Sequence, residues 1–170
     1  MKSSLLILAL ILAGCAYDVP LSEPQDLPLN LALIGIWESL PDSEAVTDDA
    51  QQMIVLPCGD GEFFVHIRSG PEGLYCRAYP IVVEGERYHQ VQLIGTVDST
   101  SLSVAGGYHV VWCRLAEGIL EVRTLNTDRV DTGIATSAAL LAAFRERRTD
   151  PDLFIDPARF RRVDPAPARQ

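Results

Sequence analysis

Four cysteines are the residues of this 170-residue chain with the widest range of possible chemistry. Cys15 stands alone near the start, whereas Cys58, Cys76 and Cys113 are spread through the middle. The chain has no Cys-x-x-Cys or His-x₃-His spacing, so the sequence indicates neither a metal site nor any other cofactor. The surroundings of each thiol must therefore decide between a disulfide, a nucleophile and a covalently modified residue.

Cys15 follows a sequence with the anatomy of a secretory signal. Lys2 supplies a positive charge, and residues 5–13 form an apolar run that is too short for the roughly 20 residues of a membrane span. Residues 12–15 read Leu-Ala-Gly-Cys, which resembles the lipobox of bacterial lipoproteins. The resemblance implies cleavage before Cys15 and acylation of this cysteine, so that it anchors the protein in a membrane. The alternative is an ordinary signal peptide in which Cys15 has no role.

The residues after Cys15 predict how the anchor meets the folded part. Ala16 replaces the Asp that usually marks inner-membrane retention, so the resemblance favours the outer membrane, with the protein facing the periplasm. Pro20, Pro24 and Pro28 predict a semi-extended tether that holds the domain away from the bilayer. We accordingly divide the chain into a signal peptide (1–14), a lipidated cysteine with its tether (15–30), one β-rich domain (31–163) and a disordered tail (164–170).

Negative charge is concentrated in the first third of the chain. After residue 14, 13 arginines and 23 acids give a net charge of −10. Residues 15–67 carry ten acids and no base, whereas residues 68–170 carry 13 of each. This balance argues against nucleic acid or an anionic membrane surface as the partner.

The spacing of turns and the alternation of apolar residues predict a mainly β domain. Short Gly-containing turns, such as Asp60-Gly61, separate strand-like runs of period two. The predicted strands are 33–39, 53–57, 63–67, 74–83, 87–95, 107–115 and 120–125. We expect an antiparallel up-and-down meander of seven or eight strands that forms a barrel or a half-barrel.

A single amphipathic helix of about residues 137–148 is expected near the C-terminus. Thr136 or Ser137 is the predicted N-cap, and Leu140 and Phe144 belong to its apolar stripe, which should pack on the barrel wall. The segment after the helix carries Phe154 and Phe160, which are expected to dock back onto the sheet.

Gly35-x-Trp37, at the start of the first predicted strand, is similar to the opening signature of lipocalin-like barrels. The resemblance implies that Trp37 plugs the closed end of the barrel and that an arginine of the last strand covers its indole. Arg123 is the residue of the last predicted strand that would do so. The order of meander and then C-terminal helix also fits, whereas the short strand region and the missing Thr-Asp-Tyr motif do not. Another small antiparallel barrel is the alternative.

The three later cysteines allow one disulfide in an oxidising envelope. In a meander, Cys58 and Cys113 end strands that run in the same direction, whereas Cys76 lies near the opposite rim, too far away to bridge. The preferred pair is therefore Cys58–Cys113, with Cys76 a buried free thiol. The alternative is that all three are simply buried thiols.

Three functions remain open from the sequence. The first is a lipid-anchored, non-catalytic binding or structural module with an envelope protein as partner; outward-facing aromatics such as Trp112 would form its surface. The second is a lipocalin-like carrier of a small apolar ligand, whose lumen would be lined by Phe63, Val65, His89, Val91, His109, Leu120 and Val122. The third is an envelope hydrolase, for which Asp131, in the protease-like sequence Asp-Thr-Gly, or a His–Cys pair would be the candidate. The sequence shows no catalytic constellation that supports this third function.

Overall fold

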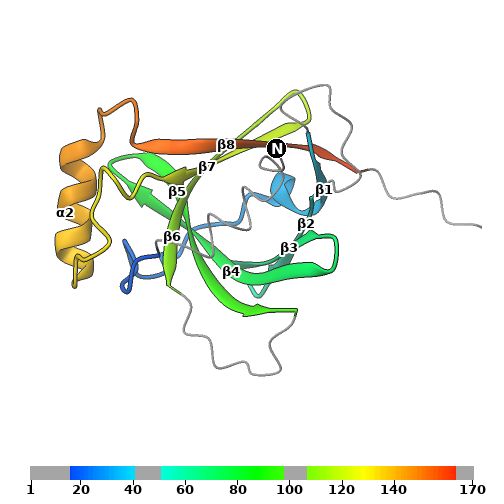
Figure 1. Ribbon diagram of the computed structural model, residues 1–170, viewed down its shortest axis with the longest axis horizontal. Coiled ribbons are helices and arrows are strands. Elements are labelled where there is room, and N and C mark those ends of the chain that lie inside the picture. The colour runs from blue at the N-terminus through cyan, green and yellow to red at the C-terminus, as the bar shows by residue number, and fades with distance from the viewer. Residues whose placement is uncertain (1–15, 41–50, 98–106, 164–170) are drawn as a thin grey trace, which may run out of the picture.

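The computed structural model describes residues 16–40, 51–97 and 107–163, which form a closed antiparallel barrel of eight strands with one α-helix outside it (Figure 1). The elements in chain order are η1 (Leu31–Leu33), β1 (Gly35–Ser39), β2 (Gln52–Cys58), β3 (Glu62–Ser69), β4 (Glu72–Val83), β5 (Glu86–Thr96), β6 (Tyr108–Ala116), β7 (Ile119–Leu125), α2 (Ser137–Arg147) and β8 (Phe154–Arg162). Each strand pairs with the next, and β8 pairs with β1. The predicted meander is confirmed, and it closes completely.

The strand that closes the barrel comes from the segment after the helix, where only docking was predicted. β8 lies between β7 and β1, with Phe160 opposite Leu120 and Arg162 opposite Trp37. Its Pro157 coincides with a shift of register in the pairing with β7, which accommodates a residue that has no N–H to donate. The helix therefore precedes the last strand. The order implied by the lipocalin resemblance, with the helix after the meander, is wrong.

Alternation along the strands creates two separate hydrophobic cores. The inner core fills the barrel and contains Trp37, Phe63, Cys76 and Phe160. The outer core lies on the outside of the wall, where side chains such as Ile81 are covered by α2 and by the N-terminal segment. A wall buried on both faces explains why β4 and β5 carry apolar or aromatic residues on both sides.

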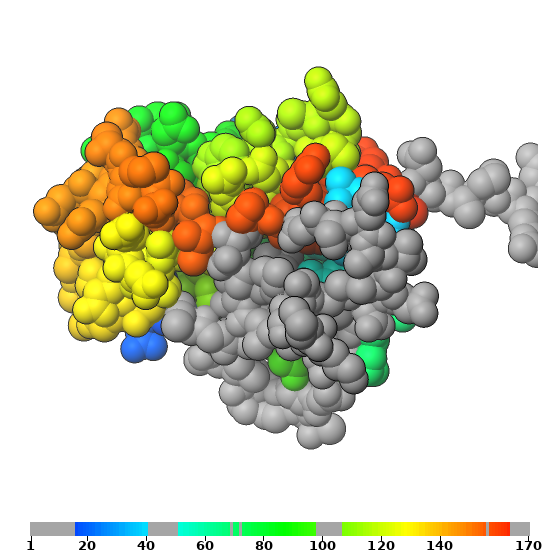
Figure 2. Space-filling model, turned by 45° about the horizontal axis from the view of Figure 1, so that its top comes forward, coloured from blue at the N-terminus to red at the C-terminus, as the bar shows by residue number. Residues whose placement is uncertain are grey.

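Helix α2 forms where it was predicted, and it packs on the barrel as expected. The Thr136 hydroxyl accepts a hydrogen bond from the Ala139 N–H (3.3 Å), so Thr136 is the N-cap. Leu140 and Phe144 are fully buried in the outer core. In the space-filling view, the loop before the helix (yellow) and the helix (orange) together form one end of the molecule (Figure 2).

The segment predicted as a free tether is instead part of the folded domain. Tyr17 forms an isolated antiparallel bridge with Tyr108 at the start of β6, with N···O distances of 2.9 and 2.7 Å. The Tyr17 hydroxyl donates to the Val130 carbonyl (2.8 Å), and the whole side chain is buried. We call residues 16–25 the N-terminal strap.

The strap continues along the outer face of the wall. The buried Leu21 donates its N–H to the side-chain oxygen of Gln90 (2.7 Å), and the Gln90 amide donates to the His109 carbonyl (2.9 Å). Farther along, Gln25 accepts a hydrogen bond from the Val82 N–H (3.1 Å). The prolines keep the strap non-helical, as predicted, but they do not make it a spacer. The signal peptide, Cys15 and the tail lie outside the described residues.

Candidate functional site

The barrel interior encloses a small apolar cavity, which we call the inner cavity. It has a volume of about 80 Å³. Its lining includes six of the seven residues predicted to line a lumen: Phe63, Val65, His89, Val91, Leu120 and Val122. His109, the seventh, is buried but does not line the cavity. The faces of the strands were therefore largely predicted from alternation, but the space that they enclose is small.

His89 is the polar exception in this apolar lining. Neither of its ring nitrogens has a hydrogen-bond partner among the described residues, and its ring lies 6.2 Å from that of Phe63. Desolvation by burial, followed by the positive charge of Arg87, lowers the pKa of His89 to about 4. His89 is therefore neutral at pH 7, so it cannot provide a buried cation for a ligand.

The inner cavity also contains cysteines, but it does not activate them. Cys76 is buried and free, as the sequence indicated, and Cys113 faces the cavity. Burial raises the pKa of each of these thiols to about 12, so both are protonated at neutral pH and are weak nucleophiles. The expected Cys58–Cys113 bridge is absent, because Cys58 is exposed on the outside of β2 whereas Cys113 points into the barrel. The three cysteines of the described residues are therefore free thiols, of which Cys58 is exposed.

Trp37 is buried in the inner core, and the arginine over its indole is a different one from that predicted. Arg162 lies over the Trp37 indole at 5.0 Å, and its Nη2 donates to the Ala32 and Ile34 carbonyls, each at 2.7 Å. The indole N–H of Trp37 donates to the Leu33 carbonyl (2.9 Å). Arg123 was predicted only because β7 was taken as the last strand; it lies over Trp112 instead, outside the barrel.

Asp131 takes part in a local turn. It is exposed in the loop before α2, and its carboxylate accepts a hydrogen bond from the Gly133 N–H (2.8 Å). This is the local bond of an Asx turn, which the residue order Asp-Thr-Gly forms readily. The motif is explained by the turn.

A larger hollow lies outside the wall, beside the C-terminal end of α2, and we call it the outer groove. It has a volume of about 210 Å³ and is lined by Tyr88, Trp112, Arg123, Arg148, Asp150, Pro151, Leu153 and Phe154. These residues come from strands β5 to β8 and from the turn that joins α2 to β8. Trp112, noted in the sequence as an outward-facing aromatic, contributes to it, as does Tyr88.

The aromatic rings beneath the outer groove are packed against one another. Tyr88 and Phe154 are stacked, with ring centroids 5.6 Å apart, and Phe144 meets Tyr88 edge-on at 5.2 Å. Burial raises the pKa of Tyr88, so its hydroxyl is neutral at pH 7. The groove therefore has a rigid aromatic base, anchored in the outer core.

The charged residues around the outer groove are held by ion pairs but keep donors free. Arg123 Nε contacts Glu121 (2.7 Å), and Arg148 Nη1 contacts Glu84 (2.9 Å). Within the described part of the chain, no hydrogen bond is donated by the Nη groups of Arg123 or by Nε or Nη2 of Arg148. The hydrogen bond from Arg123 lowers the pKa of Glu121, which keeps this carboxylate ionised.

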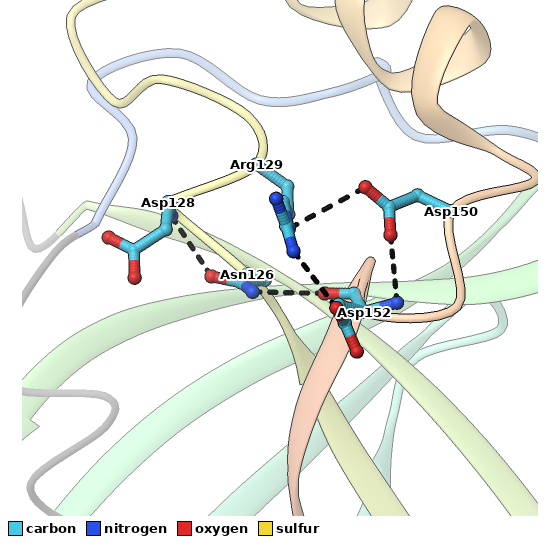
Figure 3. Close-up of polar contacts among 5 residues, drawn as sticks. All are labelled: Asn126, Asp128, Arg129, Asp150 and Asp152. Carbon is cyan, nitrogen blue, oxygen red and sulfur yellow. Dashed lines mark hydrogen bonds and ion pairs between the residues drawn. The ribbon is translucent and has the colours of Figure 1, made fainter.

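A clamp of polar contacts fixes the turn that forms one side of the outer groove (Figure 3). Arg129, from the loop before α2, contacts the carboxylates of Asp150 (3.5 Å) and Asp152 (2.9 Å). Asn126 donates through its side chain to the Asp152 carbonyl and through its backbone N–H to the Leu153 carbonyl, at 2.9 and 2.8 Å. The wall of the groove is thus preorganised by residues of two different loops. The sequence gives no local signal for it, because the pair Asn126 and Arg129 and the pair Asp150 and Asp152 lie more than 20 residues apart.

Comparison of the chain with protein-family models, with curated proteins and with solved structures gives no match. Within residues 16–40, 51–97 and 107–163, no helix is long and apolar enough to cross a membrane. In the same ranges, no three His, Cys, Asp or Glu side chains gather as a metal ion would require. Assignment of a function therefore depends on the two hollows and on the strap.

Proposed function

We propose that this protein is a lipid-anchored, non-catalytic binding module of the cell envelope that meets a protein partner through the outside of its barrel. The observation that carries the proposal is the outer groove, which lies on the outside of the barrel wall. Its tryptophan, tyrosine and arginines are the residue types that dominate binding energy at protein interfaces. The inner cavity, in contrast, is small and apolar.

The anchor follows from the lipobox-like residues 12–15 together with the strap. Acylated Cys15 would precede Tyr17 by two residues, which is about 7 Å of extended chain. Because Tyr17 is bonded to the barrel, the domain would sit directly at the bilayer, with no long spacer. Ala16 supports the outer membrane as the location.

The alternative is a carrier of a small apolar ligand in a lipocalin-like cup. The Trp37–Arg162 stack supports a lipocalin-like relationship, since it supplies the indole and arginine that this resemblance implies. Ligand pockets, however, usually have volumes of about 300–1,000 Å³. The inner cavity, at about 80 Å³, is well below this range, and we therefore favour the binding module.

Membrane attachment is tested by Cys15→Ser and fractionation of cells. We expect the wild-type protein, cut before Cys15, in the outer-membrane fraction, and Cys15→Ser absent from that fraction with its signal uncut at this site. A Cys15→Ser protein that is still processed and membrane-bound would contradict the lipid anchor.

The partner is tested by a photo-crosslinking residue at Pro151, which is exposed beside the outer groove. The matched control carries the same residue at Leu56, which is 46% exposed on β2. We expect a crosslinked protein of one defined mass from Pro151, absent from Leu56 and lost when Arg123→Glu is added. Equal crosslinking from both positions would contradict the claim that the partner binds at the outer groove.

A further inference from the structure

The outer groove has a chemistry that narrows the kind of partner segment it fits. We propose that it binds a segment carrying a carboxylate beside an aromatic side chain, with the carboxylate on Arg123 and Arg148 and the ring against Trp112. This inference rests on the proposed function and names the segment that the partner would present.

Free guanidinium donors carry the first part of the inference. Arg123 and Arg148 belong to different elements, β7 and the C-cap of α2, yet both line the groove. Their side chains are 40% and 37% exposed, and among the described residues the Nη groups of Arg123 and Nε and Nη2 of Arg148 donate no hydrogen bond. A guanidinium with unused N–H groups pairs well with a carboxylate, because the two planar groups match in geometry. Asp150 is the one acid in the lining, and it is engaged by Arg129.

Trp112 is the groove residue against which an aromatic ring of the partner would pack. This indole is half-buried and has Arg123 at 5.8 Å and Arg114 at 5.9 Å from its ring centroid. Glu121 binds both arginines, at 2.7 and 2.9 Å, so the arrangement is fixed before any partner arrives. A preorganised ring loses little conformational entropy when a second ring packs against it.

The size of the groove favours a side chain of a protein over a free small molecule. Its volume of about 210 Å³ lies below the usual lower limit of about 300 Å³ for small-molecule pockets. A single anchoring side chain with its neighbouring carboxylate needs less room. The rigid clamp and the aromatic base also match the well-packed pockets in which interface anchors are found.

The test uses the full-length protein in neutral detergent micelles, with ¹⁵N-labelled tryptophan. The probe is the peptide acetyl-Glu-Phe-Glu-amide, and the matched control is acetyl-Gln-Phe-Gln-amide. The chain has two tryptophans, so the indole N–H of buried Trp37 serves as an internal reference for that of Trp112. We expect the Glu peptide to shift only the Trp112 signal and to bind at least fivefold more tightly than the Gln peptide.

Variants assign the binding to the groove. We expect Arg123→Gln and Arg148→Gln each to weaken the Glu peptide at least threefold, while Arg68→Gln, on β3, leaves its affinity unchanged although the net charge falls equally. The inference is overturned by equal binding of the two peptides, or by a loss with Arg68→Gln as large as with the groove variants. Phosphatidylglycerol vesicles that shift Trp112 as strongly as the Glu peptide would assign the groove to the membrane instead.

The outcomes also separate this inference from the proposed function. If neither peptide binds while the Pro151 variant still crosslinks a defined protein, the proposed carboxylate–aromatic recognition is wrong. The proposal of a binding module is then unaffected. If the Glu peptide binds as expected but Pro151 crosslinks nothing and Cys15→Ser is still processed and membrane-bound, the groove chemistry is right and the proposed function fails. Thermal unfolding of each arginine variant establishes that it is folded before binding is measured.

Discussion

The inner cavity and the outer groove lie on opposite faces of the same wall, yet they differ in almost every property. The inner cavity is apolar and has a volume of about 80 Å³. Its one histidine, His89, has no hydrogen-bond partner among the described residues. The outer groove holds about 210 Å³ and combines aromatic rings with guanidinium groups. Ion pairs and the clamp of Arg129 position the charges of the groove, whereas close packing alone shapes the cavity.

This difference separates the residues that maintain the fold from those able to recognise another molecule. A buried apolar interior stabilises a small domain, but it offers few directional contacts. The exposed ion pairs of the groove contribute little to stability and keep their polar groups accessible. We therefore expect substitutions in the two regions to affect different measurements, stability for the interior and binding for the groove.

The largest effect is expected from Phe160→Ala in β8. Phe160 is fully buried in the inner core, and removal of a buried aromatic ring leaves a cavity. We expect a loss of about 3–5 kcal/mol in the free energy of unfolding, measured by urea denaturation. Trp112→Phe is the control on the other side of the wall. A similar loss of stability from both variants would contradict the assignment of stability to the interior and of binding to the groove.

Protonation of His89 should give the next effect. Because its pKa is about 4 in the folded protein and about 6.5 when unfolded, the unfolded state binds more protons between these values. Stability is therefore lost as the pH falls from about 6.5 towards 4, by up to about 1.4 kcal/mol per pH unit and about 3 kcal/mol in total.

The measurement is urea denaturation between pH 4 and pH 7, with His89→Leu compared with the wild-type protein. We expect His89→Leu to flatten this dependence. Burial and Arg68 also lower the pKa of His66, so His66→Gln is the control that isolates His89. An unchanged slope in His89→Leu would show that other groups cause the acid sensitivity.

A smaller loss is expected when the strap is forced off β6. A Cβ atom on Gly107 would lie 2.2 Å from the Cβ of Ala16 and 3.0 Å from the Tyr17 carbonyl. We expect Gly107→Ala to cost about 1–3 kcal/mol and to speed hydrogen exchange of the Tyr17 amide. Gly61→Ala meets nothing within 4 Å and should leave this exchange unchanged. Continued protection of Tyr17 in Gly107→Ala would mean that the strap can adjust without leaving the wall.

The smallest effect on stability is expected from Arg148→Gln in the groove. Exposed ion pairs such as Arg148–Glu84 contribute about 0–1 kcal/mol, so thermal unfolding should hardly change. The same variant should reduce crosslinking from Pro151 at least threefold. A clear loss of stability, with crosslinking intact, would place Arg148 among the residues that maintain the fold.

The parts of the fold that depend on local pattern were predictable from the sequence. Seven strands follow from alternation and turns, and α2 follows from its cap and apolar stripe. β8 was missed because it follows a helix and contains Pro157, which is typical of edges and not of a strand between two neighbours. The wrong choice of Arg123 follows from the same omission, since Arg162 belongs to the missing strand.

Long-range partners explain what the sequence concealed about the strap and the groove. Nothing near Tyr17 or Leu21 indicates that Val130 and Gln90 will bind them, because these partners lie 113 and 69 residues away. The outward aromatics were noted, but their division into buried rings and a groove is decided by α2 and by the turn after it. Local pattern thus predicted the wall and not what covers it.

The pairing of β1 with β8 also fixes when this domain can finish folding. Glu38 lies opposite Arg161, so closure joins residues separated by 123 positions in the chain. Until β8 emerges during synthesis, β1 and β7 each have an edge with unpaired backbone groups, which can pair with another chain. Such distant contacts form slowly. We therefore expect the sheet to keep two unpaired edges until β8 pairs with β1.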